Sequence, residues 1–287
     1  MLPPFGDMGV PRVVFLLTLL SFSVAAQAQD AAALRARHAA MKEQLGSNPF
    51  GRPMHVESAV SGASHKGEIF AVIERPFSVV APALSRPAQW CEVVTLQVNV
   101  KRCEASDEEM RTAITRRARD PADSGHAVDF RFQRAAASAD YVHVLLDAPS
   151  GPVGTRDYAI RLEAAPLDAR RTLVHMSYAY TLGTMARFAM DAYLAGAGRD
   201  KVGFSVVERT ADGRPVYVDG MRGVVERTAM RYFLAAEAYL DSLGEPAAQR
   251  LDARLRRWYA AISRYPQLRE RIGAEEYVEM KRREATG

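Results

Sequence analysis

A run of four predicted strands between residues 128 and 180 constrains the fold of this chain more than any other feature. Apolar and polar side chains alternate along these segments, and turns containing proline, glycine or aspartate separate some of them. Consecutive strands joined by tight turns pair with antiparallel neighbours, so the sequence predicts an antiparallel sheet. The four strands are residues 128–133, 141–148, 155–164 and 172–180.

A long amphipathic helix is predicted at residues 221–243, after this run. Its apolar side chains recur at three- and four-residue steps, which is the spacing of one helical face. The stripe includes Val225, Tyr232, Ala236 and Tyr239. We expect this stripe to close the sheet, so that Tyr232 and Ala236 are buried.

Shorter predicted elements surround these two features. Helices are expected at residues 30–45 and 77–84, from residue 87 onward, and at residues 184–197, 247–264 and 274–284. Strands are expected at residues 69–73 and 96–103, and a hairpin around Asp212-Gly213 joins residues 202–207 to 215–218. Residues 51–67 predict a strand-and-loop connection, and residues 104–126 a helical excursion or mobile loop.

The first 28 residues indicate a secretory signal peptide. Arg12 ends a weakly basic start, residues 13–24 form a continuous apolar run, and Ala26-Gln27-Ala28 is a small-x-small cleavage site. The run is short for a membrane span, although an uncleaved membrane anchor is the alternative. We therefore expect a soluble periplasmic protein of about 260 residues after cleavage.

Composition and charge exclude several classes of function. The chain has 48% hydrophobic and 25% charged residues, which is ordinary for a globular protein. A net charge of +4 over this length is too small to predict nucleic-acid binding. The six histidines and two cysteines show no metal-ligand spacing, so we expect no metal and no other cofactor.

Cys91 and Cys103 are the two cysteines of the chain. In an oxidising compartment, two cysteines this close in sequence favour a disulfide. A pair of buried free thiols is the alternative.

The order of the predicted elements resembles the START-like (helix-grip, polyketide cyclase-like, SRPBCC) superfamily over about residues 68–243. The similar features are the strand-plus-proline start at residues 72–77 (VIERPF), the helix of Trp90, the closing helix, and Arg156-Asp157-Tyr158, which looks like an Arg-Asp-aromatic element of START domains. The helix at 184–197 and the two C-terminal helices depart from the family plan. The sequence is therefore similar to a divergent exported branch.

This resemblance implies an α+β helix-grip fold, with a curved antiparallel sheet covered by the long helix and extra helices at both ends. The implied organisation is a signal peptide (1–28), an N-terminal helix and connector (29–66), the helix-grip domain (67–244) and a C-terminal helical extension (245–287). A cavity between sheet and helix would hold the ligand, with Arg156, Tyr178 and Tyr180 as its chief polar contacts. The alternative is that these side chains simply fill the core. The full set of candidate ligand-binding residues is Trp90, Tyr141, His143, Arg156, Tyr158, Tyr178, Tyr180 and Tyr232.

A charged set near the last hairpin has two interpretations. It either attracts an anionic head group at the cavity entrance or forms ion pairs between helix and hairpin, and the second is favoured. The set is Lys201, Arg222, Glu226, Arg227 and Arg231.

We expect an exported protein that binds a hydrophobic or amphipathic small molecule, such as a lipid, with transient membrane contact compatible with this role. The sequence contains no GxSxG elbow, P-loop or HExxH motif. One alternative is a cyclase- or hydrolase-type enzyme that uses His143 or His175 as general acid or base. The other is a structural or interaction protein with a filled core, whose C-terminal helices dock a partner.

Overall fold

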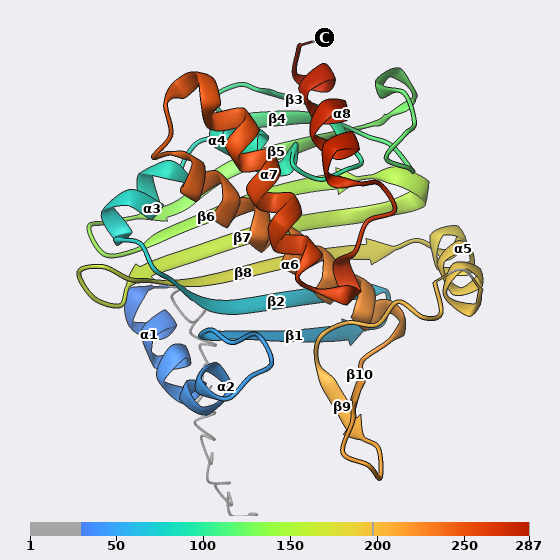
Figure 1. Ribbon diagram of the computed structural model, residues 1–287, viewed down its shortest axis with the longest axis horizontal. Coiled ribbons are helices and arrows are strands. Elements are labelled where there is room, and N and C mark those ends of the chain that lie inside the picture. Colours follow the sequence, from blue (N-terminus) through green and yellow to red (C-terminus); the bar gives the residue numbers. More distant parts are fainter. Residues whose placement is uncertain (1–29, 197, 287) are drawn as a thin grey trace, which may run out of the picture.

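The computed structural model describes residues 30–196 and 198–286, which form an α+β fold on an eight-stranded antiparallel sheet (Figure 1). The spatial order of the strands is β1-β2-β8-β7-β6-β5-β4-β3. The predicted fold class is confirmed, and the predicted signal peptide at residues 1–28 lies outside the described residues. The strands are β1 (Met54–Ser61), β2 (Ser64–Ile73), β3 (Val100–Ala105), β4 (Glu109–Ile114), β5 (His126–Ala137), β6 (Val142–Ser150), β7 (Thr155–Pro166) and β8 (Thr172–Leu182).

Helices cover both faces of the sheet, and a small separate hairpin, β9 (Val206–Arg209) with β10 (Pro215–Tyr217), projects from the molecule (Figure 1). None of the described helices is both long and apolar enough to cross a membrane. The helices are α1 (Ala31–Ala40), α2 (Lys42–Gly46), α3 (Phe77–Ala83), α4 (Pro87–Val94), α5 (Thr184–Ala195), α6 (Gly220–Ser242), α7 (Arg250–Ser263) and α8 (Ala274–Thr286).

The long helix α6 lies across one face of the sheet and packs on β1, β2 and β8. Gly67 of β2 allows the close approach, because a Cβ atom there would lie 2.4 Å from the carbonyl oxygen of Val225. Tyr232 and Ala236 of the predicted apolar stripe are buried. The prediction that this helix closes the sheet is confirmed.

The N-terminal helices cover the opposite face. Leu34 of α1 packs with Val72, Tyr141 and Leu173, whose side chains point away from α6. Strand β2 is therefore buried on both faces, which explains why residues 69–73 are apolar throughout rather than alternating.

The C-terminal helices share the core of the sheet. Helix α7 packs on α6, and α8 packs on α7 and β3. Trp258 and Tyr277 are fully buried with ring centroids 5.2 Å apart, and the Tyr277 hydroxyl donates to the carbonyl of Leu96 at 2.7 Å. The described residues 245–286 thus bury apolar surface against the predicted helix-grip region.

Residues 104–126 contain a strand rather than the predicted helix or loop. In β4, buried Met110 and Thr112 alternate with exposed neighbours such as Arg111, and the strand pairs with β3 and β5. Charged side chains on the outer face hide this two-residue period within a segment that reads as uniformly polar.

Other boundaries also differ from the prediction. Residues 51–67 form the β1–β2 hairpin, whose turn holds Gly62 at φ +58°. The helix predicted at 30–45 breaks at Met41 into α1 and α2. The strand predicted at 202–207 begins only at Val206, because the preceding residues bind Glu226 of α6.

Cys91 of α4 and Cys103 of β3 form the predicted disulfide. Their Cα atoms lie 5.3 Å apart, within the usual range for a disulfide. The bond joins a helix to the edge strand of the sheet, so it fixes α4 in place.

Removal of this disulfide should lower the melting temperature. A closed loop of this length stabilises a fold by about 3 kcal/mol in the chain-entropy model, which corresponds to about 6–10 °C for a protein of this size. Scanning calorimetry of the Cys91→Ser/Cys103→Ser variant measures the change, and thiol titration of the unfolded, unreduced parent should find no free thiol. Two free thiols, or an unchanged melting temperature, would contradict the assignment.

Candidate functional site

Four predicted ligand contacts meet beneath α6. Tyr158 of β7 and Tyr178 and Tyr180 of β8 lie on the face that α6 covers, together with Tyr232 of α6 itself. Ring centroids are 5.5 Å apart between Tyr178 and Tyr232, and 5.6 Å apart between Tyr158 and Tyr180. Because the rings contact one another, they occupy space that the sequence assigned to a cavity. Their role as ligand contacts stays a prediction.

The hydroxyls of this tyrosine cluster are only partly paired. Tyr158 shares a hydrogen bond of 2.6 Å with Oγ1 of Thr155. Among the described residues we find no partner for the hydroxyls of Tyr178, Tyr180 and Tyr232. Burial raises the pKa of all four tyrosines, so each phenol stays neutral and can donate or accept a hydrogen bond.

Arg156 does not join the tyrosine cluster. Its side chain is 59% exposed and lies 3.4 Å from the carboxylate of Asp157. Asp157 has φ +53°, and the β7–β8 register shifts between Arg156 and Ala159. This irregularity breaks the alternation that placed Arg156 and Tyr158 on one face. The prediction of Arg156 as a buried contact in the cavity is therefore wrong.

Trp90 is a core residue. It is fully buried, and its indole nitrogen donates to the carbonyl of Leu84 at 2.8 Å. Its one polar group is thus satisfied within the corner that joins α3 to α4.

Tyr141 and His143 lie on the face of the sheet opposite α6. The neighbours of His143, Val142 and Val144, belong to the core beneath α6, so alternation turns His143 and His175 outward. The prediction that Tyr141 and His143 line one cavity with the tyrosine cluster is wrong. For the same reason, neither histidine can act as a general acid or base beneath α6.

A chain of polar side chains crosses this outer face. His175 of β8 contacts Glu68 of β2 through Nε2 at 3.0 Å and Glu163 of β7 through Nδ1 at 2.7 Å. Lys66 lies 2.8 Å from Glu68, and the Tyr141 hydroxyl donates to Glu163. We call these five residues the outer-face network.

Opposite charges within the outer-face network stabilise the ionised forms of its histidine and carboxylate side chains. Burial opposes the charge on His175, but hydrogen bonds to Glu163 and Glu68 outweigh it and raise its pKa. Burial likewise opposes the charge on Glu68, and its bonds to His175 and Lys66 lower its pKa to about 2. Among the described residues, no group of three or more His, Cys, Asp or Glu side chains is arranged to bind a metal ion.

The charged set near the hairpin serves mainly to tie loops to α6. Arg227 donates to the carbonyls of Lys201 and Val202, and Arg231 pairs with Glu270 at 2.5 Å. Buried Glu226 accepts four hydrogen bonds, from the backbone amides of residues 204 and 205 and from two serine hydroxyls. These contacts tie α6 to neighbouring segments, but they are mostly hydrogen bonds to backbone and serine groups and not the predicted ion pairs between helix and hairpin.

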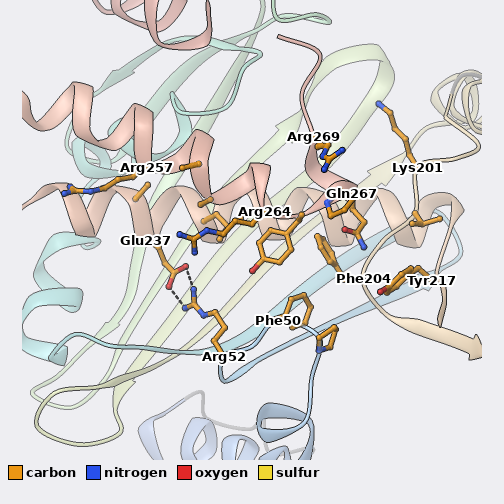
Figure 2. A pocket seen from close by; sticks show the side chains of 18 of the residues that line it. Phe50, Arg52, Lys201, Phe204, Tyr217, Glu237, Arg257, Arg264, Gln267 and Arg269 are labelled. Atoms are coloured by element: carbon orange, nitrogen blue, oxygen red, sulfur yellow. Dashed lines mark hydrogen bonds and ion pairs between the residues drawn. The ribbon is translucent and has the colours of Figure 1, made fainter. Parts of the chain in front are cut away.

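A cleft of about 910 Å³ lies on the side of α6 opposite Tyr232 and Ala236 (Figure 2). Its wall on α6 is formed by residues three and four apart, including Leu234 and Ala238. The other walls come from the end of α7, the 3₁₀ segment η4 (Pro266–Leu268), the loop after α2 and the loop before β9. Segments far apart in the sequence thus enclose one hollow.

Three aromatic rings pack together in this cleft. Phe50, Phe204 and Tyr265 lie with centroids 5.7 to 6.1 Å apart, and each comes from a different segment. Phe204 is buried, whereas Phe50 and Tyr265 are half-buried. We call these three residues the aromatic triangle.

An ion pair borders the aromatic triangle. The guanidinium of Arg52 binds both carboxylate oxygens of Glu237, one of them at 2.9 Å (Figure 2). Burial raises the pKa of Glu237 against the opposing effect of Arg52, and burial also raises the pKa of Tyr265. At this border of the aromatic triangle, the positive charge of Arg52 is therefore neutralised by the carboxylate of Glu237.

Sequence reasoning missed this cleft because its residues lie mostly in loops. The signals near it were the breakers at residues 46–49 and the Tyr265-Pro266 step, each with an aromatic side chain beside it. Such signals indicate where helices and strands end, but they do not predict which of these ends lie next to one another in the folded protein.

No protein-family model matches the sequence, and no curated protein is significantly similar to it. Several solved structures are similar in backbone plan. A point mutant of norcoclaurine synthase from Thalictrum flavum matches with a TM-score of 0.35 and 12% identity, over 47% of this chain and 86% of that one. A START superfamily protein from Mycobacterium smegmatis matches with a TM-score of 0.33 and 12% identity, over 46% and 87%. XoxI from Bacillus cereus matches with a TM-score of 0.31 and 9% identity, over 57% and 95%.

The chain is similar to START superfamily proteins over about half its length. At these identities and TM-scores the matches carry no information on ligand or activity.

The outer-face network should give a pH-dependent contribution to stability. Because the folded pKa of His175 is raised, its contribution is complete below its ordinary value of 6.5 and is lost as pH rises through the folded pKa. Glu68 contributes above its ordinary value of 4.5, and that part is lost as pH falls toward about 2. At pH 6, His175→Gln should lower the free energy of unfolding by about 3 kcal/mol, because two carboxylates then lose their shared cation.

Urea unfolding between pH 5 and pH 9 measures this difference. His126→Gln, which changes an exposed histidine, is the matched control. If the gap between parent and His175→Gln stayed constant across this range, the charged pairing of His175 would be refuted.

Proposed function

We propose that this protein binds a hydrophobic or amphipathic small molecule, and that the cleft between α6 and α7 is its binding site. The observation that carries this proposal is the aromatic triangle in an open cleft of about 910 Å³. Small-molecule sites in proteins are typically clefts of this size with apolar and aromatic walls. Apolar contact in such a cleft supplies affinity at about 25 cal/mol per Å² of buried surface.

The tyrosine cluster beneath α6 is the second candidate location. It is supported by the three hydroxyls for which we find no partner among the described residues. The four rings of this cluster contact one another, whereas the cleft is open with a volume of about 910 Å³, so we favour the cleft.

Filling the cleft should reduce binding of an apolar fluorescent probe, 1-N-phenylnaphthylamine. Ala260 is exposed and lines the cleft, so Ala260→Trp occupies the hollow without disturbing the core. Blocking about 60 Å² of apolar contact corresponds to about tenfold weaker binding. Fluorescence titration gives the dissociation constants, and mass spectrometry of an organic extract identifies any ligand that copurifies.

Two control variants make this test specific. Ala192→Trp adds the same side chain to exposed α5 and should leave binding unchanged. Tyr232→Phe removes one hydroxyl of the tyrosine cluster. If Tyr232→Phe weakened probe binding and Ala260→Trp did not, the ligand would lie beneath α6 and the cleft assignment would fail.

We also propose that the protein is exported to the periplasm through cleavage after Ala28. The apolar run at residues 13–24 and the disulfide between Cys91 and Cys103 support this. Expressed in a Gram-negative host, the chain should appear in the osmotic-shock fraction with Gln29 as its first residue. Leu16→Arg/Leu19→Arg should keep the uncleaved precursor in the cytoplasm. Recovery of the parent uncleaved in the cytoplasm would refute export.

A further inference from the structure

Charge in the cleft is unevenly paired. Its lining includes five cationic side chains and three carboxylates. Glu237 is already bound by Arg52, and Asp241 is bound by Arg75 at 2.6 Å. The third carboxylate, Asp200, lies 3.6 Å from Arg199. Arg257 donates to the backbone carbonyl of Asp241 at 2.7 Å. These groups therefore have little capacity left for a charged ligand.

The other three cations have no carboxylate within ion-pair distance among the described residues. They are Lys201, Arg264 and Arg269, and Figure 2 shows them above Phe50 and Phe204 in that view. The ammonium group of Lys201 lies 5.7 Å from the centroid of the Tyr193 ring.

The helix dipole of α7 explains the position of one of these cations. Arg264 caps the C-terminus of α7, where a positive charge is favourable by itself. Lys201 and Arg269 lie outside helices, so this explanation does not extend to them. The excess positive charge borders the cleft that holds the aromatic triangle.

We propose that the cleft recognises an amphipathic molecule with one anionic head group: a carboxylate, a sulfate or a phosphate monoester. This inference rests on the proposed function and adds the chemistry of the head group. Guanidinium groups bind such oxyanions through paired, charge-assisted hydrogen bonds. The aromatic triangle contacts the apolar chain of the same ligand. The head group and the apolar chain are therefore bound by different parts of one cleft.

Because the three cations are exposed, the binding of an anionic ligand should depend on ionic strength. Because these side chains are hydrated when the cleft is empty, their attraction for the head group is screened by salt. Binding of the anionic ligand therefore weakens as ionic strength rises. Binding of a neutral ligand with the same chain does not.

A pair of ligands that differ only in the head group tests this inference. Calorimetric titration at low salt, below the micellar range, compares dodecanoate with 1-dodecanol. Dodecanoate should bind about tenfold or more tightly, because hydrogen bonds to charged groups contribute more than neutral ones. Arg264→Gln/Arg269→Gln should bring the two affinities within about twofold, chiefly by weakening the binding of dodecanoate.

Matched controls separate the outcomes. Arg116→Gln/Arg117→Gln removes the same charge from exposed positions outside the cleft and should preserve the preference for dodecanoate. Equal binding of the two ligands to the parent would overturn the head-group inference while the proposed function stood. Binding of neither ligand would overturn both. If inorganic phosphate bound as tightly as dodecanoate, the cleft would be a site for free anions and the amphipathic ligand would be wrong.

Discussion

The buried carboxylate of Glu226 is the contact on which the arrangement around α6 depends. It is fully enclosed, and it accepts hydrogen bonds from Ser58 of β1 at 2.6 Å and from the backbone amides of Phe204 and Ser205 at 2.7 and 2.9 Å. A buried charge without such partners would be strongly destabilising. The helix, the edge strand and the loop before β9 are therefore fixed relative to one another by one side chain. Gly203 fits this contact, because a Cβ atom there would lie 2.5 Å from the carboxylate.

The two faces of the sheet use different chemistry. Beneath α6, apolar and aromatic side chains exclude water and pack on one another. On the outer face, the outer-face network pairs cations and carboxylates of neighbouring strands at the margin of α1. Charge on that face is tolerated because each ionised group has a partner, and this matching favours the observed register of β2, β7 and β8.

Periodicity predicted most of the fold. The four-strand run, the stripe of α6 and the disulfide followed from local pattern and spacing. β4 was missed because charged residues obscured its alternation, and Arg156 was misplaced because the irregularity at Asp157 leaves no mark in a period-2 pattern. Tyr178, Tyr180 and Tyr232 could be placed together because they occupy a regular strand and a regular helix, and because the family resemblance put that strand beneath the helix. The cleft could not be predicted, because its aromatic triangle comes from loops whose meeting depends on the docking of α7 against α6.

The cleft joins the two ends of the polypeptide. Phe50 follows the second helix, while Tyr265 belongs to the last quarter of the chain. A partly synthesised chain therefore has the sheet and α6 before it has a complete cleft, since α7 and η4 follow α6 in the sequence. Occupancy of the cleft would bridge early and late segments, so a bound molecule would slow the detachment of the C-terminal helices from the sheet. Binding competence in this protein would therefore depend on the docking of α7 against α6.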